Sequence, residues 1–180
     1  TLGDSSATTN ENTFVGDRAG YSNVAASNTF VGSDAGYKNT VGTQNVLIGY
    51  EAGTNNVGGS GLTLVGYQAG LAATSGYNTM VGLQAGKATT TGTYNSFFGS
   101  GAGMANVDGS YNAVLGDDAG HSNTSGSANS FFGSEAGYKN TTGYRNAFFG
   151  EDAGHADACV LLDAYQLYKA GISTASDYRH

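Results

Sequence analysis

The chain has 180 residues, 30 of them glycine, with no proline, no tryptophan and a formal net charge of −7. Lys and Arg total only seven, so there is no basic stripe for a phosphate backbone, and the negative charge should repel nucleic acid and anionic membrane surfaces. The single cysteine, Cys159, excludes an intrachain disulfide, and no apolar run is long enough for membrane insertion.

A motif, Asn-x-h-h-Gly-x-x-Ala-Gly (h apolar), recurs nine times at an almost constant spacing. The first Gly of each copy is, in chain order, Gly16, Gly32, Gly49, Gly66, Gly82, Gly99, Gly116, Gly133 and Gly150. A period this regular indicates one structural unit stacked on itself. Leu62 replaces the Asn in the fourth copy, whereas the first Gly and the Ala-Gly pair occur in every copy. The two Gly and the Ala of the motif are expected to have a structural role. In the first, second and eighth copies they are Gly16, Ala19, Gly20, Gly32, Ala35, Gly36, Gly133, Ala136 and Gly137.

Two fixed motif positions hold 18 of the 30 glycines, which predicts backbone with positive φ or close approach to a neighbour. The apolar pair before the first Gly favours a strand. A strand of about five residues plus Gly turns fits one coil, whereas solenoids of helix pairs need about 34 residues per repeat. Residues 1–155 are therefore predicted to form an all-β, parallel β-solenoid of nine coils, roughly 40 Å long at about 4.8 Å per coil.

The two apolar residues of each motif are neighbours in sequence, so they should point to opposite faces of the strand. One can fill the coil interior with the Ala of Ala-Gly, and the other needs cover from outside. Three chains around an axis, two chains, or a thicker monomeric solenoid would each provide it. In chain order the pairs are Phe14-Val15, Phe30-Val31, Leu47-Ile48, Leu64-Val65, Met80-Val81, Phe97-Phe98, Val114-Leu115, Phe131-Phe132 and Phe148-Phe149.

No catalytic, cofactor or metal pattern emerges from the sequence. His121 and His155 share one repeat position two coils apart, which a surface ladder explains, and a zinc site needs three or four convergent ligands. Gly99 to Gly103 belongs to the sixth motif copy, and no helix follows it as in a nucleotide fingerprint. Acidic residues after the first Gly are interpreted as solvated turns, with calcium binding as the alternative: Asp17, Asp34, Asp117, Asp118, Glu135, Glu151 and Asp152.

Three surface features offer alternatives for binding. Exposed tyrosines are candidate contacts for sugar rings, or else they pack coil against coil: Tyr21, Tyr37, Tyr50, Tyr67 and Tyr138. A column of Thr13, Thr29, Thr63, Thr79, Ser96 and Ser130 suggests ice binding, but Val46, Ala113 and Ala147 interrupt it. Asn123 and Asn140 match the N-glycosylation acceptor pattern, which a Thr- and Asn-rich repeat also produces by chance.

The repeat, clearest from Asn129 to Gly143, resembles those that precede endosialidase-type intramolecular chaperone domains in phage tail fibres and other surface proteins. More loosely, it is similar to the head repeats of trimeric autotransporter adhesins. The resemblance implies a left-handed β-roll in an intertwined homotrimer, without cofactors. It also implies a virion or cell-surface location and a role in host attachment, with a surface glycan or protein receptor as partner.

The final segment, 156–180, breaks the period and is expected to be a connector to a chaperone domain that this chain lacks. By the resemblance, Ser176 and Asp177 mark a self-cleavage junction and the segment forms short strands. A helix is the alternative, because Leu161, Tyr165, Tyr168 and Ile172 have helical spacing. Thr1-Leu2-Gly3 looks like part of an earlier coil, so the chain is expected to be an excised fragment. Because it lacks the chaperone domain, no enzyme activity is expected of it.

We therefore expect a structural or adhesive segment of a trimeric surface fibre, matured with a cleavable trimerisation chaperone. A carbohydrate-binding or ice-binding solenoid is the alternative. A polysaccharide-degrading spike is a weaker one, because Glu51, Glu135 and Glu151 lie in different coils without a paired catalytic pattern.

Overall fold

The structure is a computed structural model that describes residues 11–155. The expected connector at 156–180 lies outside the described residues, and with it the junction at Ser176 and Asp177 and the choice between strand and helix. Among the described residues there is no helix long and apolar enough to cross a membrane.

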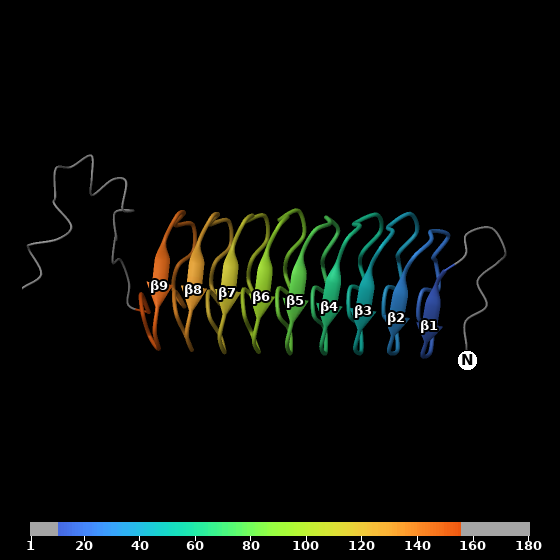
Figure 1. Cartoon of the computed structure of the whole chain (residues 1–180), viewed down its shortest axis with the longest axis horizontal. Helices are drawn as coiled ribbons and strands as arrows, with labels where there is room; N and C mark the ends of the chain where they lie inside the picture. Colours follow the sequence, from blue (N-terminus) through green and yellow to red (C-terminus); the bar gives the residue numbers. More distant parts are fainter. Residues whose placement is uncertain (1–10, 156–180) are drawn as a thin grey trace, which may run out of the picture.

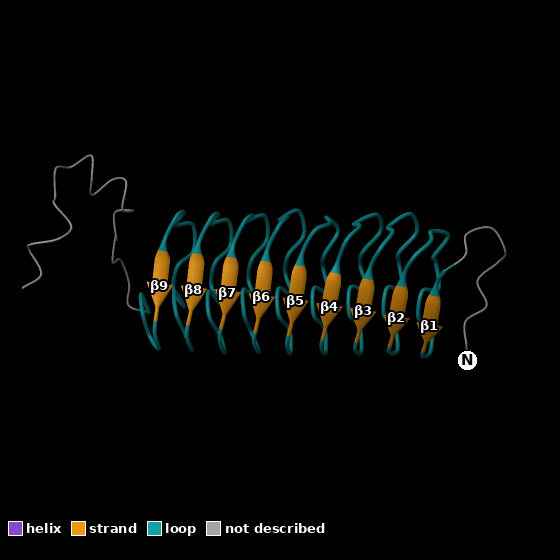
Figure 2. Ribbon diagram, in the orientation of Figure 1, coloured by secondary structure: helices purple, strands orange, loops and turns teal. Residues whose placement is uncertain are grey.

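Nine short strands stack in sequence order into one parallel sheet, which confirms the predicted all-β parallel solenoid (Figures 1 and 2). Each coil supplies one strand, and the rest of the coil is turn and loop. The strands are β1 (Thr13–Val15), β2 (Thr29–Val31), β3 (Val46–Ile48), β4 (Thr63–Val65), β5 (Thr79–Val81), β6 (Ser96–Phe98), β7 (Ala113–Leu115), β8 (Ser130–Phe132) and β9 (Ala147–Phe149).

Equivalent motif positions pair directly across the sheet. Phe14 pairs with Phe30, and Phe97 pairs with Val114, in the same register. Positions in a coil are counted below from the first Gly of the motif, so these residues are at position −2. This register places every motif position in a column that runs along the rod.

The core is built from two such columns. The position −2 side chains, from Phe14 to Phe148, are all buried, as are the motif alanines from Ala19 to Ala136. Consecutive aromatic rings stack where the sequence supplies them, with centroids 4.9 Å apart for Phe14 and Phe30. The position −3 and −1 side chains point outward, as the adjacent apolar pair predicts.

The strands have three residues rather than the expected five or so. The residue at position −5 has positive φ in every coil, and so does the Gly at position 0. Only four residues lie between these two bends, and the first of them, usually Asn, is turned inward and buried, as Asn95 is. The bends at positions −5 and 0 and the inward turn at position −4 therefore leave only three residues for each strand.

The predicted backbone role of the repeated glycines is confirmed. Gly82 has φ of +141°, and a Cβ there would collide with the carbonyl of Gly99 in the next coil. Gly103, the second Gly of its motif, has φ of +57°, and a Cβ would lie 2.7 Å from the Phe97 ring. The first Gly of the motif leaves room for the backbone of the next coil, and the second Gly leaves room for the core side chain.

Two columns of buried asparagines hold the turns. The motif Asn at position −4 and a second Asn at position +7 donate their amides to the same turn carbonyl; Asn112 and Asn123, for example, both bond to the Gly126 oxygen, at 2.8 and 2.9 Å. The Asn112 side-chain oxygen also accepts the backbone N–H of Asn129 in the next coil, at 3.0 Å. In the fourth coil Leu62 and Ala73 replace both asparagines, and both are buried in the apolar core.

Candidate functional site: the outer face of the sheet

The outer face of the sheet consists of the position −3 and position −1 side chains. Position −1 is apolar in all nine coils, and we call this set the outer apolar column. Its members are half-buried or exposed, with Phe98 41% exposed and Leu115 51% exposed. They are Val15, Val31, Ile48, Val65, Val81, Phe98, Leu115, Phe132 and Phe149.

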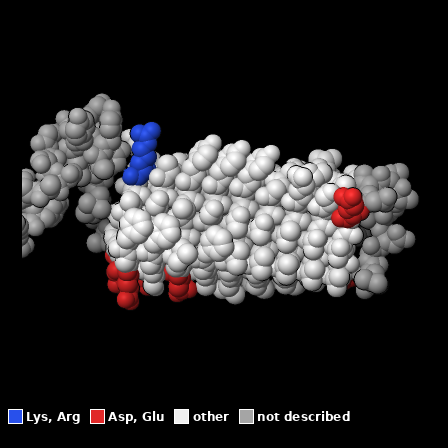
Figure 3. Space-filling view, viewed as in Figure 1, with Lys and Arg blue, Asp and Glu red and all other residues white. Residues whose placement is uncertain are grey.

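This face carries almost no charge. The position −3 residues beside the outer apolar column are Thr, Ser, Ala or Val, and none is ionisable. In Figure 3, which looks onto the strands, Lys, Arg, Asp and Glu appear only at the margins of the described surface. A continuous apolar strip runs along the rod. It is bordered on one side by the uncharged position −3 residues, and on the other side the glycines at position 0 separate it from position +1, where Asp17, Asp117 and Glu151 are charged. An exposed apolar surface of this extent is typical of an interaction site.

Aromatic side chains stack along the rod. Phe132 and Phe149 stack at 5.1 Å within the outer apolar column. Tyr77, Tyr94 and Tyr111, at position −5, form a second ladder with centroids 5.1 Å apart, although all three are at least half exposed. This ladder was not among the predicted surface features, although three tyrosines at one repeat position indicate it in the sequence.

The five tyrosines proposed as sugar contacts are all stacked on a ring of an adjacent coil. Tyr21 stacks on Tyr37 at 5.3 Å, and Tyr50 stacks on Tyr67 at 5.5 Å. Tyr138 lies between His121 and His155, at 4.9 and 5.2 Å. These contacts describe coil-to-coil packing, and sugar binding by the same side chains stays a prediction.

The Thr column lies at position −3, on the face shared with the outer apolar column. Thr29, Thr63 and Thr79 are half-buried at the first position of their strands. Val46 is exposed in the same column and interrupts the row of hydroxyls.

The two asparagines that match the glycosylation pattern are turned inward. Asn123 is 3% exposed and donates its amide to Gly126 and to Asn106. Asn140 donates to the side-chain oxygen of Asn123 at 2.9 Å. Both lie at position +7, where their amides are held in hydrogen bonds between coils.

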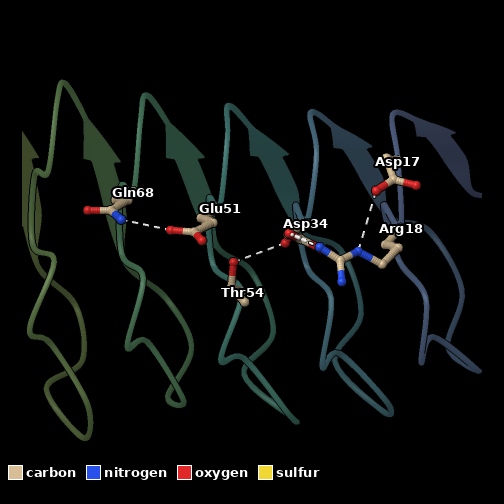
Figure 4. A network of polar contacts seen from close by, with 6 residues as sticks. All are labelled: Asp17, Arg18, Asp34, Glu51, Thr54 and Gln68. Carbon is tan, nitrogen blue, oxygen red and sulfur yellow. Dashed lines mark hydrogen bonds and ion pairs between the residues drawn. The ribbon is translucent and has the colours of Figure 1, made fainter.

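The acidic residues after the first Gly fall into two columns. Those at position +1 are exposed, as at Asp17, Asp117 and Glu151. The position +2 residues form a polar column (Figure 4), in which Asp34 is buried, Asp118 and Glu135 are half-buried and Asp152 is exposed. There Arg18 donates to the Asp34 carboxylate at 2.7 Å, and Gln68 donates to Glu51 at 2.7 Å.

Two local effects in the polar column follow from these carboxylates. Asp34 is 8% exposed, and its second carboxylate oxygen has no hydrogen-bond partner among the described residues. The hydrogen bond from Tyr50 to Glu51, with the negative charge of Glu51, raises the pKa of the Tyr50 phenol above its ordinary value.

At the end of the same column, Glu135, Asp152 and His155 converge. One ligand atom from each lies within 4.8 Å of the other two. His121 does not join them, because Tyr138 separates the two histidine rings. This cluster is not evident from the spacing of the two histidines, because its members come from positions +2 and +5 of adjacent coils.

Comparisons with known proteins give no further assignment, because no family model, curated protein or solved structure matches the chain.

Proposed function

We propose that this chain is a structural segment of a homotrimeric surface fibre that serves attachment to a host or another surface. The observation that carries the proposal is the outer apolar column, which is uncharged and partly exposed along nine successive coils. Large apolar patches of this kind on soluble proteins mark interaction surfaces. A second and third copy of the same chain would cover it with matching periodicity.

A copy of the chain is the partner that best fits the length and regularity of this face. Every coil offers the same pattern at the same spacing, so parallel copies aligned in register meet equivalent residues at every level. The outer face itself, made of position −3 and position −1 residues, brings no like charges together across such an interface, although each chain carries a net charge of −7. The number three rests on the resemblance to tail-fibre and adhesin repeats.

The same resemblance extends the proposal to maturation and location. The parent protein would fold with a C-terminal trimerisation chaperone that is released at Ser176-Asp177, and the fibre would lie on a virion or cell surface. Parallel pairing between separate chains nucleates slowly, and an attached trimeric domain would raise the local concentration of the three chains. The rod would then hold a receptor-binding part away from the particle.

The test places charge on the outer face. We expect the double variant Val81→Lys and Phe98→Lys to abolish assembly, because it would bury unpaired ammonium groups between chains. The matched control is Ala72→Lys and Ala105→Lys. These alanines occupy position +6, where the repeat itself carries Lys38 and Lys139. Sedimentation velocity should show assembled protein for the parent chain and the control, but monomer for the outer-face variant.

Circular dichroism on both variants checks that the solenoid itself remains folded. If the outer-face variant stays folded and assembles as the parent does, the interface proposed here is wrong. A parent chain that is already monomeric would also contradict the proposal.

A further inference from the structure

The cluster of Glu135, Asp152 and His155 is positioned by the coil geometry. Asp152 lies one coil beyond Glu135 at the same position, and its backbone N–H bonds to the Ser134 carbonyl at 3.0 Å. A tight turn, closed by the His155 N–H and the Asp152 carbonyl at 2.9 Å, brings the imidazole back over the polar column. The His155 Nε2 then lies 2.8 Å from a carboxylate oxygen of Glu135.

The charge pattern of the polar column differs at this end. In the first coils, each carboxylate of the column has a hydrogen-bond donor from the same column, Arg18 for Asp34 and Gln68 for Glu51. In the last three coils Asp118, Glu135 and Asp152 occupy this position in succession, so acidic residues follow one another along the column. Like charges at this spacing repel, and a bound cation would remove the repulsion.

The His155 ring departs from the regular ladder. His121 stacks on Tyr138 with an interplanar angle of 11°, whereas His155 is tilted by 34° from the same ring. The tilted ring contacts Glu135 through Nε2 while one face remains against Tyr138. The imidazole is thus held by packing with its Nε2 against the Glu135 carboxylate.

We propose that Glu135, Asp152 and His155 bind a divalent transition-metal ion, with Zn²⁺ as the best chemical match. Two carboxylates and one imidazole are a donor set that zinc uses, with water in the remaining position. Ligand atoms around a tetrahedral zinc are about 3.4 Å apart, given metal–ligand distances of about 2.1 Å. Closing from 4.8 Å requires only small rotations of side chains that are partly exposed.

The ion would fasten the ninth coil to the eighth. Among the described strands β9 pairs only with β8, whereas β2 to β8 each pair with two strands. A metal that binds the folded coil alone would stabilise it by mass action. The site lies within one chain, so it does not depend on the proposed trimer.

The test is calorimetric titration of ZnCl₂ into the full chain, prepared without a polyhistidine tag and stripped with EDTA. We expect one saturable site per chain, and at least tenfold weaker binding in Glu135→Gln and His155→Gln, because each removes one ligand. The matched control is His121→Gln, at the same repeat position two coils earlier. The coil before His121 has Gly101 in the polar column, at the position where the coil before His155 has Glu135. The His121→Gln variant should bind Zn²⁺ as the parent does, and MgCl₂ should give no comparable signal.

A second set of measurements keeps the test decisive if one of the ligand variants folds poorly. Co²⁺ bound to the parent chain should show visible absorption bands that Zn²⁺ displaces, and Zn²⁺ should raise the melting temperature of the parent but not of Asp152→Asn. The proposal fails if the parent shows no saturable binding at millimolar Zn²⁺. It also fails if the ligand variants bind as tightly as His121→Gln does.

Discussion

At the residue scale, the unusual feature is the number of ordinary residues with left-handed backbone conformation. Within residues 11–155, sixteen residues other than glycine have positive φ, and all of them lie at positions −5 and +2 of the repeat. They include Tyr94 and Glu51, with φ of +58° and +56°. An L-residue in this region costs about 1–2 kcal/mol, so the stacked coils must hold these bends against local preference. Gly61 and Gly101 occupy the same two positions in single coils.

Replacing one of these residues with glycine should therefore stabilise the protein. Ala128 has φ of +58° and is exposed, so Ala128→Gly is expected to raise the free energy of unfolding by roughly 0.5–1 kcal/mol. The control Ala88→Gly, at a residue without positive φ, should lower it by a similar amount, because glycine has more freedom to lose. Urea unfolding measures both. Equal destabilisation by the two substitutions would show that the bend at position −5 carries no strain.

The sequence predicts the glycine positions because only glycine fits them, and it does so in every copy. It does not predict the bends at positions −5 and +2, because residues as different as Ser27, Tyr77 and Arg145 occupy position −5. Stacking between coils imposes those conformations, so the local preferences of these residues do not predict them. The same bends shorten each strand to three residues, which is why the expected strand length was too great.

At the element scale, the turns are held by pairs of asparagines. In a complete coil two amides share one turn carbonyl, as Asn112 and Asn123 share that of Gly126. The fourth coil loses both asparagines together, and Leu62 and Ala73 fill the space. The repeated Asn was evident from the sequence, but its partners were not, because the hydrogen bonds cross from one coil to the next.

This joint replacement predicts coupling between the two positions. Asn112→Leu alone and Asn123→Ala alone should each cost about 2–3 kcal/mol, because each leaves buried polar groups without a partner. The double variant reproduces the pair found in the fourth coil, so it should cost less than the sum of the single changes, by about 1 kcal/mol or more. A double-mutant cycle from urea unfolding measures the coupling. Additivity within about 0.5 kcal/mol would mean that the two side chains act independently.

The candidate surfaces were predictable to different degrees. The alternation of Phe97 and Phe98 was sufficient to place one side chain inside and the other outside, and the structure confirms this. The cluster around His155 was not predictable from a search for neighbouring ligands, because Glu135 belongs to the preceding coil and is distant in sequence. Glu135 is at position +2 of one coil and His155 at position +5 of the next, and only the repeat register reveals that these positions meet.

At the scale of the whole molecule, the fold is a rod with one face unlike the others (Figure 1). The core of each coil is thin, with one position −2 side chain and one motif alanine facing the interior. The outer apolar column is as regular as that core, yet it remains partly exposed in a single chain. We propose that this strip is the surface through which the rod joins a bundle of identical rods.

The molar mass of the chain in solution tests this account most directly. Size-exclusion chromatography coupled to light scattering should give a mass three times the 18.2 kDa of one chain. That value would make the outer apolar column the core between three subunits. A mass near 18.2 kDa at micromolar concentration would contradict the account, because the apolar strip would then face water in a stable monomer.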